Sequence, residues 1–291
     1  MNHPPTSPDA VPEAVGLIAG NGLYPETFAR AARRAGVGRL VMSAFVNETK
    51  PEVEALVDAT EWLRVGQLGR MIRFFKQQDV RHAVMVGQIA PRNLFDLRPD
   101  FRALALLARL RQRNAESIFG GIGAELAKEG IELMSAIRFL DDQLAPEGLV
   151  AGPKPKARRW RDAEYGFGIA KETSRLDIGQ TVLVKFGTVL AVEAFEGTNA
   201  AIERGGKLGR HAEVTLVKVS KPNQDFRFDV PVIGPDTITT AHAAGVNLVA
   251  VEAGRTLILG REQLTGLAER LRVSVLGLGG TAETAATVDR G

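Results

Sequence analysis

The segment KPNQDFRFDVPVIG at residues 221–234, here called the signature segment, holds the residues best suited to chemistry. Within it Asp225, Arg227 and Asp229 alternate with apolar residues. If the segment is extended, side chains at every second position share a face, so two carboxylates and a guanidinium would point the same way. Carboxylate oxygens suit Mg²⁺, and a guanidinium can bind phosphate through two parallel hydrogen bonds. A solvated strand face with a structural Arg–Asp pair fits the same pattern.

Two acids, Glu193 and Glu196, lie between a predicted strand at 189–193 and a predicted helix at 198–204. Thr198 is expected to cap that helix through its hydroxyl. Ligand sites of α/β proteins collect where strands end, so both acids are candidates for the site and for metal binding. Glu196 also fits an ordinary surface acid beside a turn glycine.

A glycine-rich turn, Gly20, Asn21 and Gly22, follows the apolar run AVGLIA at residues 14–19 and precedes a helical pattern. Glycines let backbone N–H groups approach a phosphate at a helix N-terminus, so the turn is a candidate nucleotide contact. It lacks the third glycine of a dinucleotide fingerprint, and AFV at residues 44–46 offers no acid for a ribose hydroxyl. A plain tight turn is the alternative.

Other polar residues flank these motifs. Asp177 and Gln180 lie in the segment RLDIGQ, where they either cap a turn or line a site. Lys221 and Gln224 begin the signature segment. A lysine there could stabilise negative charge that develops on a phosphate.

Composition narrows the class of protein. Of 291 residues 45% are hydrophobic and 24% charged, as in ordinary globular proteins, and the net charge is only +3. Acids and bases alternate along the chain, so we expect no nucleic-acid partner. The absence of cysteine excludes disulfides and cysteine-based metal sites, and the four histidines lack metal-ligand spacing. No signal peptide or apolar run of membrane-spanning length is visible, which predicts a cytoplasmic protein.

The elements that must position these residues alternate between strands and helices, which predicts parallel sheets covered by helices. Strands are expected at 14–19, 40–44, 61–65, 83–86, 131–134, 181–185, 189–193, 214–219, 248–251, 257–259 and 273–276, and helices at 24–35, 68–77, 101–129 with a break near Asn114, 160–176, 198–204, 238–244 and 261–270. The length favours two domains. We expect a tail at 1–12, a first domain at 13–144, a Pro-, Gly- and Lys-rich linker at 145–159, a second domain at 160–280 and a tail at 281–291.

Several of these segments together resemble a known family. SRLDIGQ at 174–180, VLAVEAFEGTNAAI at 189–202, the signature segment, and GLIAGNG at 16–22 are similar to the UDP-2,3-diacylglucosamine pyrophosphatases of the LpxI type, which serve lipid A biosynthesis. The resemblance runs over nearly the whole chain, to Leu276. It implies an N-terminal Rossmann-like domain with a parallel sheet, a C-terminal mixed α/β domain and a homodimer.

The resemblance also implies a reaction. This is Mg²⁺-dependent hydrolysis of the substrate's pyrophosphate to UMP and 2,3-diacylglucosamine 1-phosphate, in which water attacks the α-phosphorus. We expect at most peripheral contact of the protein with the inner membrane. Asp229, in the Arg-x-Asp-x-Pro motif, would be the key aspartate. Asp229, with Asp225 or Glu193 and Glu196, would hold the metal. Arg227 and Asp225 are expected to be catalytic together with Asp229. The residues expected to contact substrate are Gly20, Asn21, Gly22, Gln180, Thr198, Lys221 and Gln224.

Three positions depart from the family pattern. Asn199 replaces an aspartate, Ala115 stands at the first position of an acidic pair of which Glu116 remains, and Gln88 replaces a basic residue. These departures keep an alternative open, in which the chain is a non-catalytic protein that binds a nucleotide sugar or a lipid phosphate with the same fold.

Overall fold

The computed structural model describes residues 10–89, 99–111 and 115–279. The chain divides into two compact units, the first formed by Met1–Asp141 with Asp225–Asp229 and the second by Asp142–Gln224 with Val230–Gly291. Both units are α/β, as the sequence predicts. Most of the two expected tails lies outside the described residues.

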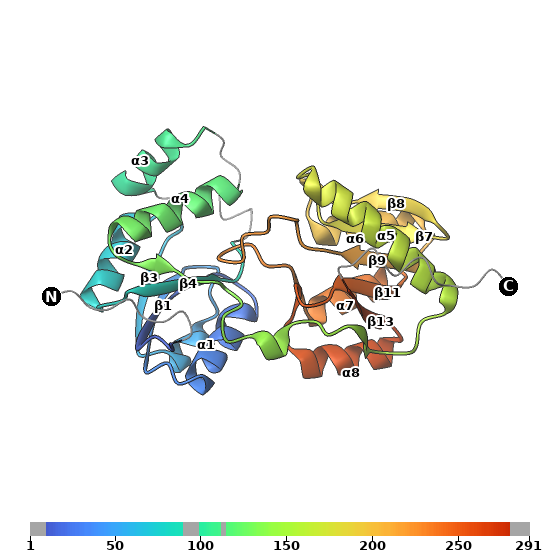
Figure 1. Ribbon diagram of the computed structural model, residues 1–291, viewed down its shortest axis with the longest axis horizontal. Coiled ribbons are helices and arrows are strands. Elements are labelled where there is room, and N and C mark those ends of the chain that lie inside the picture. The colour runs from blue at the N-terminus through green and yellow to red at the C-terminus, as the bar shows by residue number, and fades with distance from the viewer. Residues whose placement is uncertain (1–9, 90–98, 112–114, 280–291) are drawn as a thin grey trace. The chain divides into compact units, whose positions relative to one another are not determined.

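The first unit is built on a five-stranded parallel sheet with the order β3-β2-β1-β4-β5 (Figure 1). Its strands are β1 (Ala14–Ala19), β2 (Arg39–Phe45), β3 (Ala59–Leu63), β4 (His82–Val86) and β5 (Glu132–Leu133). The strand order reverses between β1 and β4, because the chain adds strands on one side of β1 and then returns to the other. Ligands of open parallel sheets bind beyond the carboxyl ends of the strands at such a reversal.

Helices cover both faces of this sheet. They are α1 (Tyr24–Arg34), α2 (Leu68–Gln77), α3 (Phe101–Arg109) and α4 (Ala115–Lys128), with a short 3-10 turn η1 (Pro51–Leu56). Apolar residues of α2, α3 and α4 pack with Ile18, Val41 and Met85 in one core. On the opposite face, shown in Figure 1, Phe28 of α1 lies 5.9 Å from Phe139 between ring centroids.

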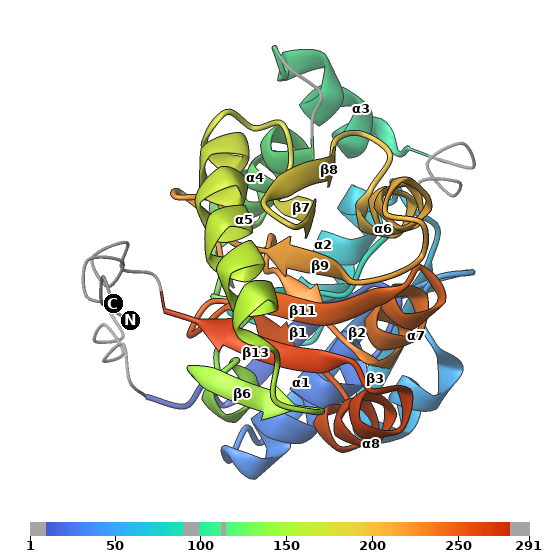
Figure 2. The same ribbon diagram turned by 90° about the vertical axis from the view of Figure 1, so that its right-hand side faces the viewer.

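The second unit has a six-stranded mixed sheet with the order β6-β13-β11-β9-β7-β8 (Figure 2). Its central strands β9, β11 and β13 are parallel, whereas β6, β7 and β8 each run antiparallel to their inner neighbour. The strands are β6 (Gly148–Ala151), β7 (Thr181–Lys185), β8 (Thr188–Val192), β9 (Val214–Lys218), β11 (Val246–Glu252) and β13 (Ser274–Leu278), with a separate parallel pair β10 (Val232–Ile233) and β12 (Leu257–Ile258).

Figure 2 shows the helices of the second unit on the two faces of its sheet. They are α5 (Ala157–Arg175), α6 (Thr198–Leu208), α7 (Pro235–Ala243) and α8 (Arg261–Leu271), and a 3-10 turn η3 (Asp141–Gln143) precedes β6. Ala163 and Ala170 of α5 pack on one face, while Ile202, Ile238 and Leu264 of the other three helices pack on the opposite one. The second sheet is therefore packed between two buried apolar layers, one on each face.

The segment expected as a linker, residues 145–159, contains structure. It holds β6, which pairs with β13, and the start of α5. The strand has only four residues, and Gly148 and Gly152 at its ends have positive φ angles, so its composition is that of a loop. Among the described residues, we find no helix with the length and apolar character that crossing a membrane requires.

Candidate functional site

The predicted glycine turn lies at the point where the strand order of the first sheet reverses. The backbone N–H of Gly20 donates to the Val86 carbonyl and that of Asn21 donates to the Gln88 carbonyl, each at 2.8 Å. A Cβ on Gly20 would lie 2.5 Å from the Gln88 carbonyl oxygen, so this glycine permits the loops after β1 and β4 to touch. Gly22, with φ 91°, borders open space. The turn thus has a structural role at Gly20, whereas the described residues leave Gly22 open to a ligand.

An acid that the sequence reasoning missed lies beside this turn. Glu48 follows β2 and is 6% exposed, and its carboxylate accepts a 3.0 Å hydrogen bond from the Asn21 side chain. Residues 44–46 hold no acid, as the sequence shows, but Glu48 follows two positions later, within the turn after β2. An acid near this strand end can bind ribose hydroxyls in Rossmann-like sheets.

The middle of the signature segment forms a tight turn rather than an extended strand. The backbone N–H groups of Phe228 and Asp229 both donate to the Asp225 carbonyl, at 3.2 and 2.9 Å. The expectation of alternating faces at 225–229 was therefore wrong. The signature segment is also divided, since Lys221 and Gln224 belong to the second unit whereas Asp225–Asp229 belongs to the first.

Two contacts anchor this turn in the first unit. The Phe228 ring packs against Phe119 of α4, with centroids 5.8 Å apart, and the Ala136 N–H donates a 2.7 Å hydrogen bond to the Phe226 carbonyl. The Ala136 carbonyl in turn accepts from the Tyr24 hydroxyl at 2.9 Å, and burial raises the pKa of that hydroxyl. The start of α1 and the turn are thus linked through one residue.

Asp225 and Arg227 form a bidentate pair at the turn. Arg227 Nε lies 2.9 Å from Asp225 Oδ1 and Nη2 lies 2.6 Å from Oδ2, while the Arg227 backbone N–H donates to Oδ1. The guanidinium lowers the pKa of the Asp225 carboxyl, which therefore stays ionised. Asp225 is engaged by this pair, and half-buried Asp229 is a separate carboxylate on the same turn.

In the second unit, the site residues collect at the end of β9 and its neighbours. The buried Lys218 Nζ donates a 2.9 Å hydrogen bond to Thr198 Oγ1, and that hydroxyl donates to Glu193 Oε1 at 2.7 Å. Thr198 does not cap α6 as predicted, because Gly197 occupies the cap position and the threonine hydroxyl is used by the glutamate. The sequence reasoning missed Lys218, although it is a lysine that ends the apolar run VTLV.

Three buried amide or carboxylate atoms at this edge have no hydrogen-bond partner among the described residues, and neither has the hydroxyl of Thr181, the residue opposite Lys218 in the sheet. The three are Glu193 Oε2, Gln180 Oε1 and Gln224 Nε2. An unsatisfied buried polar group costs about 1–3 kcal/mol, so such groups are rare unless a ligand or water completes them. Two are acceptors and one is a donor, as a polar ligand with hydroxyl and phosphate groups would require.

The start of the signature segment is held by the second unit. Gln224 Oε1 accepts from the Lys221 backbone N–H at 2.7 Å, and Lys221 Nζ pairs with Asp177, whose φ of 55° is in the left-handed region. Asp177 therefore orients Lys221 instead of capping a helix. The Gln180 carbonyl accepts from the Val219 N–H, which places Gln180 beside the end of β9.

A buried ion pair that the sequence reasoning also missed fixes the loop after β9. Glu252, 3% exposed at the end of β11, accepts from Lys171 Nζ at 3.0 Å and from both the backbone and the hydroxyl of Ser220, at 2.8 and 2.7 Å. Arg255 Nε donates to the same hydroxyl at 2.6 Å. Because Ser220 directly precedes Lys221, this network sets where the signature segment begins.

Glu196 lies outside this cluster of contacts. Its carboxylate pairs with Arg204, which lowers its pKa, and accepts from the Ala194 N–H. In the part of the chain that the structure describes, no group of three or more His, Asp or Glu side chains is placed to hold a metal. Of the expected metal ligands, Glu193 and Glu196 belong to the second unit and Asp229 to the first.

Comparison with known proteins covers both units. A model of the LpxI N-terminal domain matches residues 14–143, and a model of the LpxI C-terminal domain matches residues 146–276. The chain is 31% identical over 275 residues to a protein of Caulobacter vibrioides named UDP-2,3-diacylglucosamine pyrophosphatase LpxI. This alignment spans 91% of the chain and 97% of the relative.

Proposed function

Because this chain belongs to the LpxI family, we propose that it hydrolyses the pyrophosphate bond of UDP-2,3-diacylglucosamine in lipid A biosynthesis. The products are UMP and 2,3-diacylglucosamine 1-phosphate. The support is the full length of the match, since both domain models and 97% of the named relative are covered.

The observation that carries the proposal is the set of unsatisfied atoms at the end of β9. Gln224 Nε2 is a buried donor suited to a phosphate oxygen, and Gln180 Oε1 is a buried acceptor suited to a substrate hydroxyl. Lys218 and Lys221 add positive charge beside them. Donors fixed before the reaction stabilise charge that develops on a phosphoryl group, because they need no reorganisation.

The donor chemistry fits a magnesium ion. Mg²⁺ usually binds through one or two carboxylates, with waters and substrate phosphates completing its shell, so a three-residue cluster is not required. Glu193 offers a buried carboxylate oxygen that has no partner among the described residues, and Asp229 is a second carboxylate in the signature segment. When bound, Mg²⁺ would neutralise charge on the pyrophosphate oxygens. Glu196, held by Arg204, is the weaker ligand candidate.

The remaining roles follow from what each side chain can reach. Asp229 orients the water that attacks the α-phosphorus and accepts its proton. Arg227 stabilises charge on the phosphates, and its pair with Asp225 holds the guanidinium ready for two parallel hydrogen bonds. The free outer end of the turn at Gly22 and the acid Glu48 contact the UMP portion. Thr198 positions Glu193 through its hydroxyl.

The protein is further proposed to act as a cytoplasmic homodimer with at most peripheral membrane contact. Light scattering coupled to size-exclusion chromatography measures the dimer directly, and a mass equal to one chain would exclude it. The chain's fractionation between cytosol and washed membranes tests the location.

The central experiment incubates the protein with UDP-2,3-diacylglucosamine and measures UMP, with Mg²⁺ or with a chelator. We expect release only with the metal and a loss of at least about a hundredfold in Asp229→Asn. Asp236→Asn, which alters an exposed aspartate on α7, is the matched control and should retain full activity.

Three outcomes separate the parts of the proposal. Tight substrate binding without any UMP favours the non-catalytic binding protein that Asn199, Ala115 and Gln88 left open. Full turnover of Asp229→Asn removes only the role of Asp229. In water enriched with heavy oxygen the label should enter UMP, and label in the lipid phosphate would mean attack at the other phosphorus.

A further inference from the structure

Helix α3 exposes an apolar face. Its inner side packs through Ala103 and Leu106, which are 7% and 8% exposed. On its outer side Phe101 is 92% exposed and Leu104 is 49% exposed. Removing two such side chains from water is favourable by a few kcal/mol. A helix that exposes both therefore presents a surface that can bind an apolar partner.

Two arginines lie near this helix, Arg73 in a groove that Phe101 also lines and Arg111 two residues past the end of α3. Arg73 on α2 and Arg111 beyond the end of α3 make no hydrogen bond or ion pair with any residue of the described ranges. Arg70, one turn before Arg73 on the same helix, is by contrast paired with Glu61 at 2.5 Å. Arg73 lines the same groove as Asp100 and Phe101, so it lies beside the start of α3.

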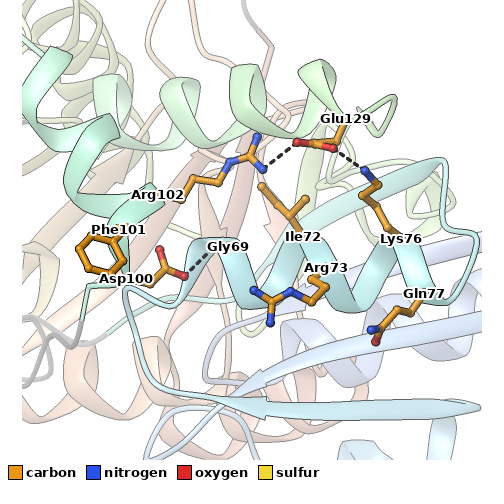
Figure 3. Close-up of a pocket in the computed structure, with 9 residues that line it drawn as sticks. All are labelled: Gly69, Ile72, Arg73, Lys76, Gln77, Asp100, Phe101, Arg102 and Glu129. Atoms are coloured by element: carbon orange, nitrogen blue, oxygen red, sulfur yellow. Dashed lines mark hydrogen bonds and ion pairs between the residues drawn. The ribbon is translucent and has the colours of Figure 1, made fainter.

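A groove of about 620 Å³ joins the apolar and the charged residues (Figure 3). Lys76 and Arg102 line it and share Glu129, which they hold ionised by lowering its pKa. Asp100 accepts from backbone N–H groups of both α2 and α3, so its charge is offset by two helix N-termini. Figure 3 shows Arg73 extending from α2 and Phe101 beside Asp100 at the start of α3.

We propose that the outer face of α3 docks on an anionic lipid membrane. Phe101 and Leu104 enter the boundary between headgroups and acyl chains, while Arg73 and Arg111 meet lipid phosphates. Amphipathic helices with aromatic and aliphatic residues on one side and basic residues beside them lie in membrane interfaces in this way. The inference goes beyond the proposed reaction, because the protein can bind vesicles whether or not it turns over substrate.

Charge favours a membrane over a second copy of the chain. In a two-fold contact the same surface meets itself, so Arg73 and Arg111 would approach the cations of the partner copy. An anionic lipid surface instead attracts each of these arginines, by about 1 kcal/mol per residue close to the surface. An anionic membrane would thus both bury the apolar side chains and attract the arginines.

To test the role of the apolar residues, the full-length protein is sedimented with vesicles and the bound fraction is measured. The vesicles consist of phosphatidylcholine alone or contain one third phosphatidylglycerol. We expect binding to the anionic vesicles only, and a loss of at least tenfold in the double variant Phe101→Ser/Leu104→Ser. Phe186→Ser/Leu208→Ser replaces exposed apolar residues of the second unit, 48% and 58% exposed, and should bind as the wild type does. Equal binding of all three proteins would overturn the proposal.

To test the role of charge, vesicle binding of Arg73→Gln is compared with that of Arg70→Gln, because the two substitutions change the net charge equally. We expect about fivefold weaker vesicle binding for Arg73→Gln and less than a twofold change for Arg70→Gln, because Glu61 already neutralises Arg70. Raising the salt concentration should weaken binding of the wild type. Equal effects of the two variants would contradict a local headgroup contact.

Two further readouts separate membrane docking from other roles of this face. UMP release from substrate dispersed in neutral detergent should be unchanged in Phe101→Ser/Leu104→Ser. Lost turnover there, with the fold intact by circular dichroism, would make the face a substrate site and overturn the proposal. A change from dimer to monomer in the same variant would make it a subunit contact and would overturn it as well.

Discussion

Glu193 and Glu196 are separated by two residues in sequence but differ in what surrounds them. Glu193 is 9% exposed and accepts a hydrogen bond from Thr198 through one oxygen, while its second oxygen has no partner within the described ranges. Glu196 is engaged by Arg204 and by a backbone N–H. Both were metal candidates from the sequence, because spacing alone cannot tell which of two acids faces inwards.

This difference predicts opposite results for two matched substitutions. Glu193→Gln should lower kcat/KM for UMP release by about ten- to a hundredfold, because it removes the unpartnered carboxylate oxygen that suits a metal. Glu196→Gln should stay within about twofold. Activity titrated against Mg²⁺ measures both, and a larger loss for Glu196→Gln would reverse the assignment.

At the scale of secondary structure, periodicity predicted most of the fold. The apolar run at 14–19 and the helical pattern at 68–77 coincide with β1 and α2, and most other boundaries shift by one to three residues. Strand β6 was missed because four residues between glycines carry too little periodicity. Fully buried parallel strands are uninterrupted apolar runs, so they are the easiest to recognise.

The site was less predictable than the fold, for a physical reason. The alternation at Asp225, Arg227 and Asp229 looks extended, yet the Asp225 carbonyl accepts from two later N–H groups and closes a turn. Tertiary contacts of Phe226 and Phe228 hold that turn, and a local pattern contains no information about them. Lys218 and Glu252 were missed because single polar residues at strand ends resemble ordinary surface positions.

Helices α3 and α4 are joined through Glu125, a carboxylate with 9% side-chain exposure. Lys128 and then Arg102 hydrogen-bond to it and lower its pKa from the ordinary value of 4.5. A carboxyl whose pKa is lowered by folding stabilises the fold above its unfolded pKa, and that stabilisation disappears as the pH falls through the folded pKa.

We therefore predict that Glu125→Gln lowers the unfolding midpoint by about 3 °C at pH 7, measured by calorimetry. The difference from the wild type should begin to shrink as the pH falls below about 4.5 and should vanish once the wild-type carboxyl is protonated. Glu172→Gln alters an exposed carboxylate that pairs with Arg175, and should have little effect. A difference that does not depend on pH would contradict the ionic origin.

At the scale of the molecule, the first unit is not one continuous stretch of chain. Residues Asp225–Asp229 complete it, and Phe228 packs into the core formed by α2, α3 and α4. The first continuous stretch of this unit ends at Asp141, close to the boundary that composition suggests. This stretch is not the whole unit, because Asp225–Asp229 also belongs to it.

This arrangement predicts that a fragment ending at Asp141 unfolds at a lower temperature than the same unit in the whole protein. In the full chain, Phe228→Ala should destabilise the first unit by about 2 kcal/mol, since the ring is half-buried, whereas Phe186→Ala on the second unit should not. Calorimetry with hydrogen exchange of α4 amides locates the effect. Unchanged exchange in α4 would show that Phe228 is dispensable to that core.

The same insertion bears on the order in which the molecule is made. A ribosome releases the chain from its N-terminus, and domains usually fold as soon as they emerge. Here Phe119 is synthesised long before Phe228, its ring partner in the first unit. The N-terminal half must therefore wait, with part of its apolar core uncovered, until most of the second unit has left the exit tunnel. The turn that carries Asp229 thus forms when the first unit is finished, so this proposed catalytic residue reaches its place only after most of the chain has been made.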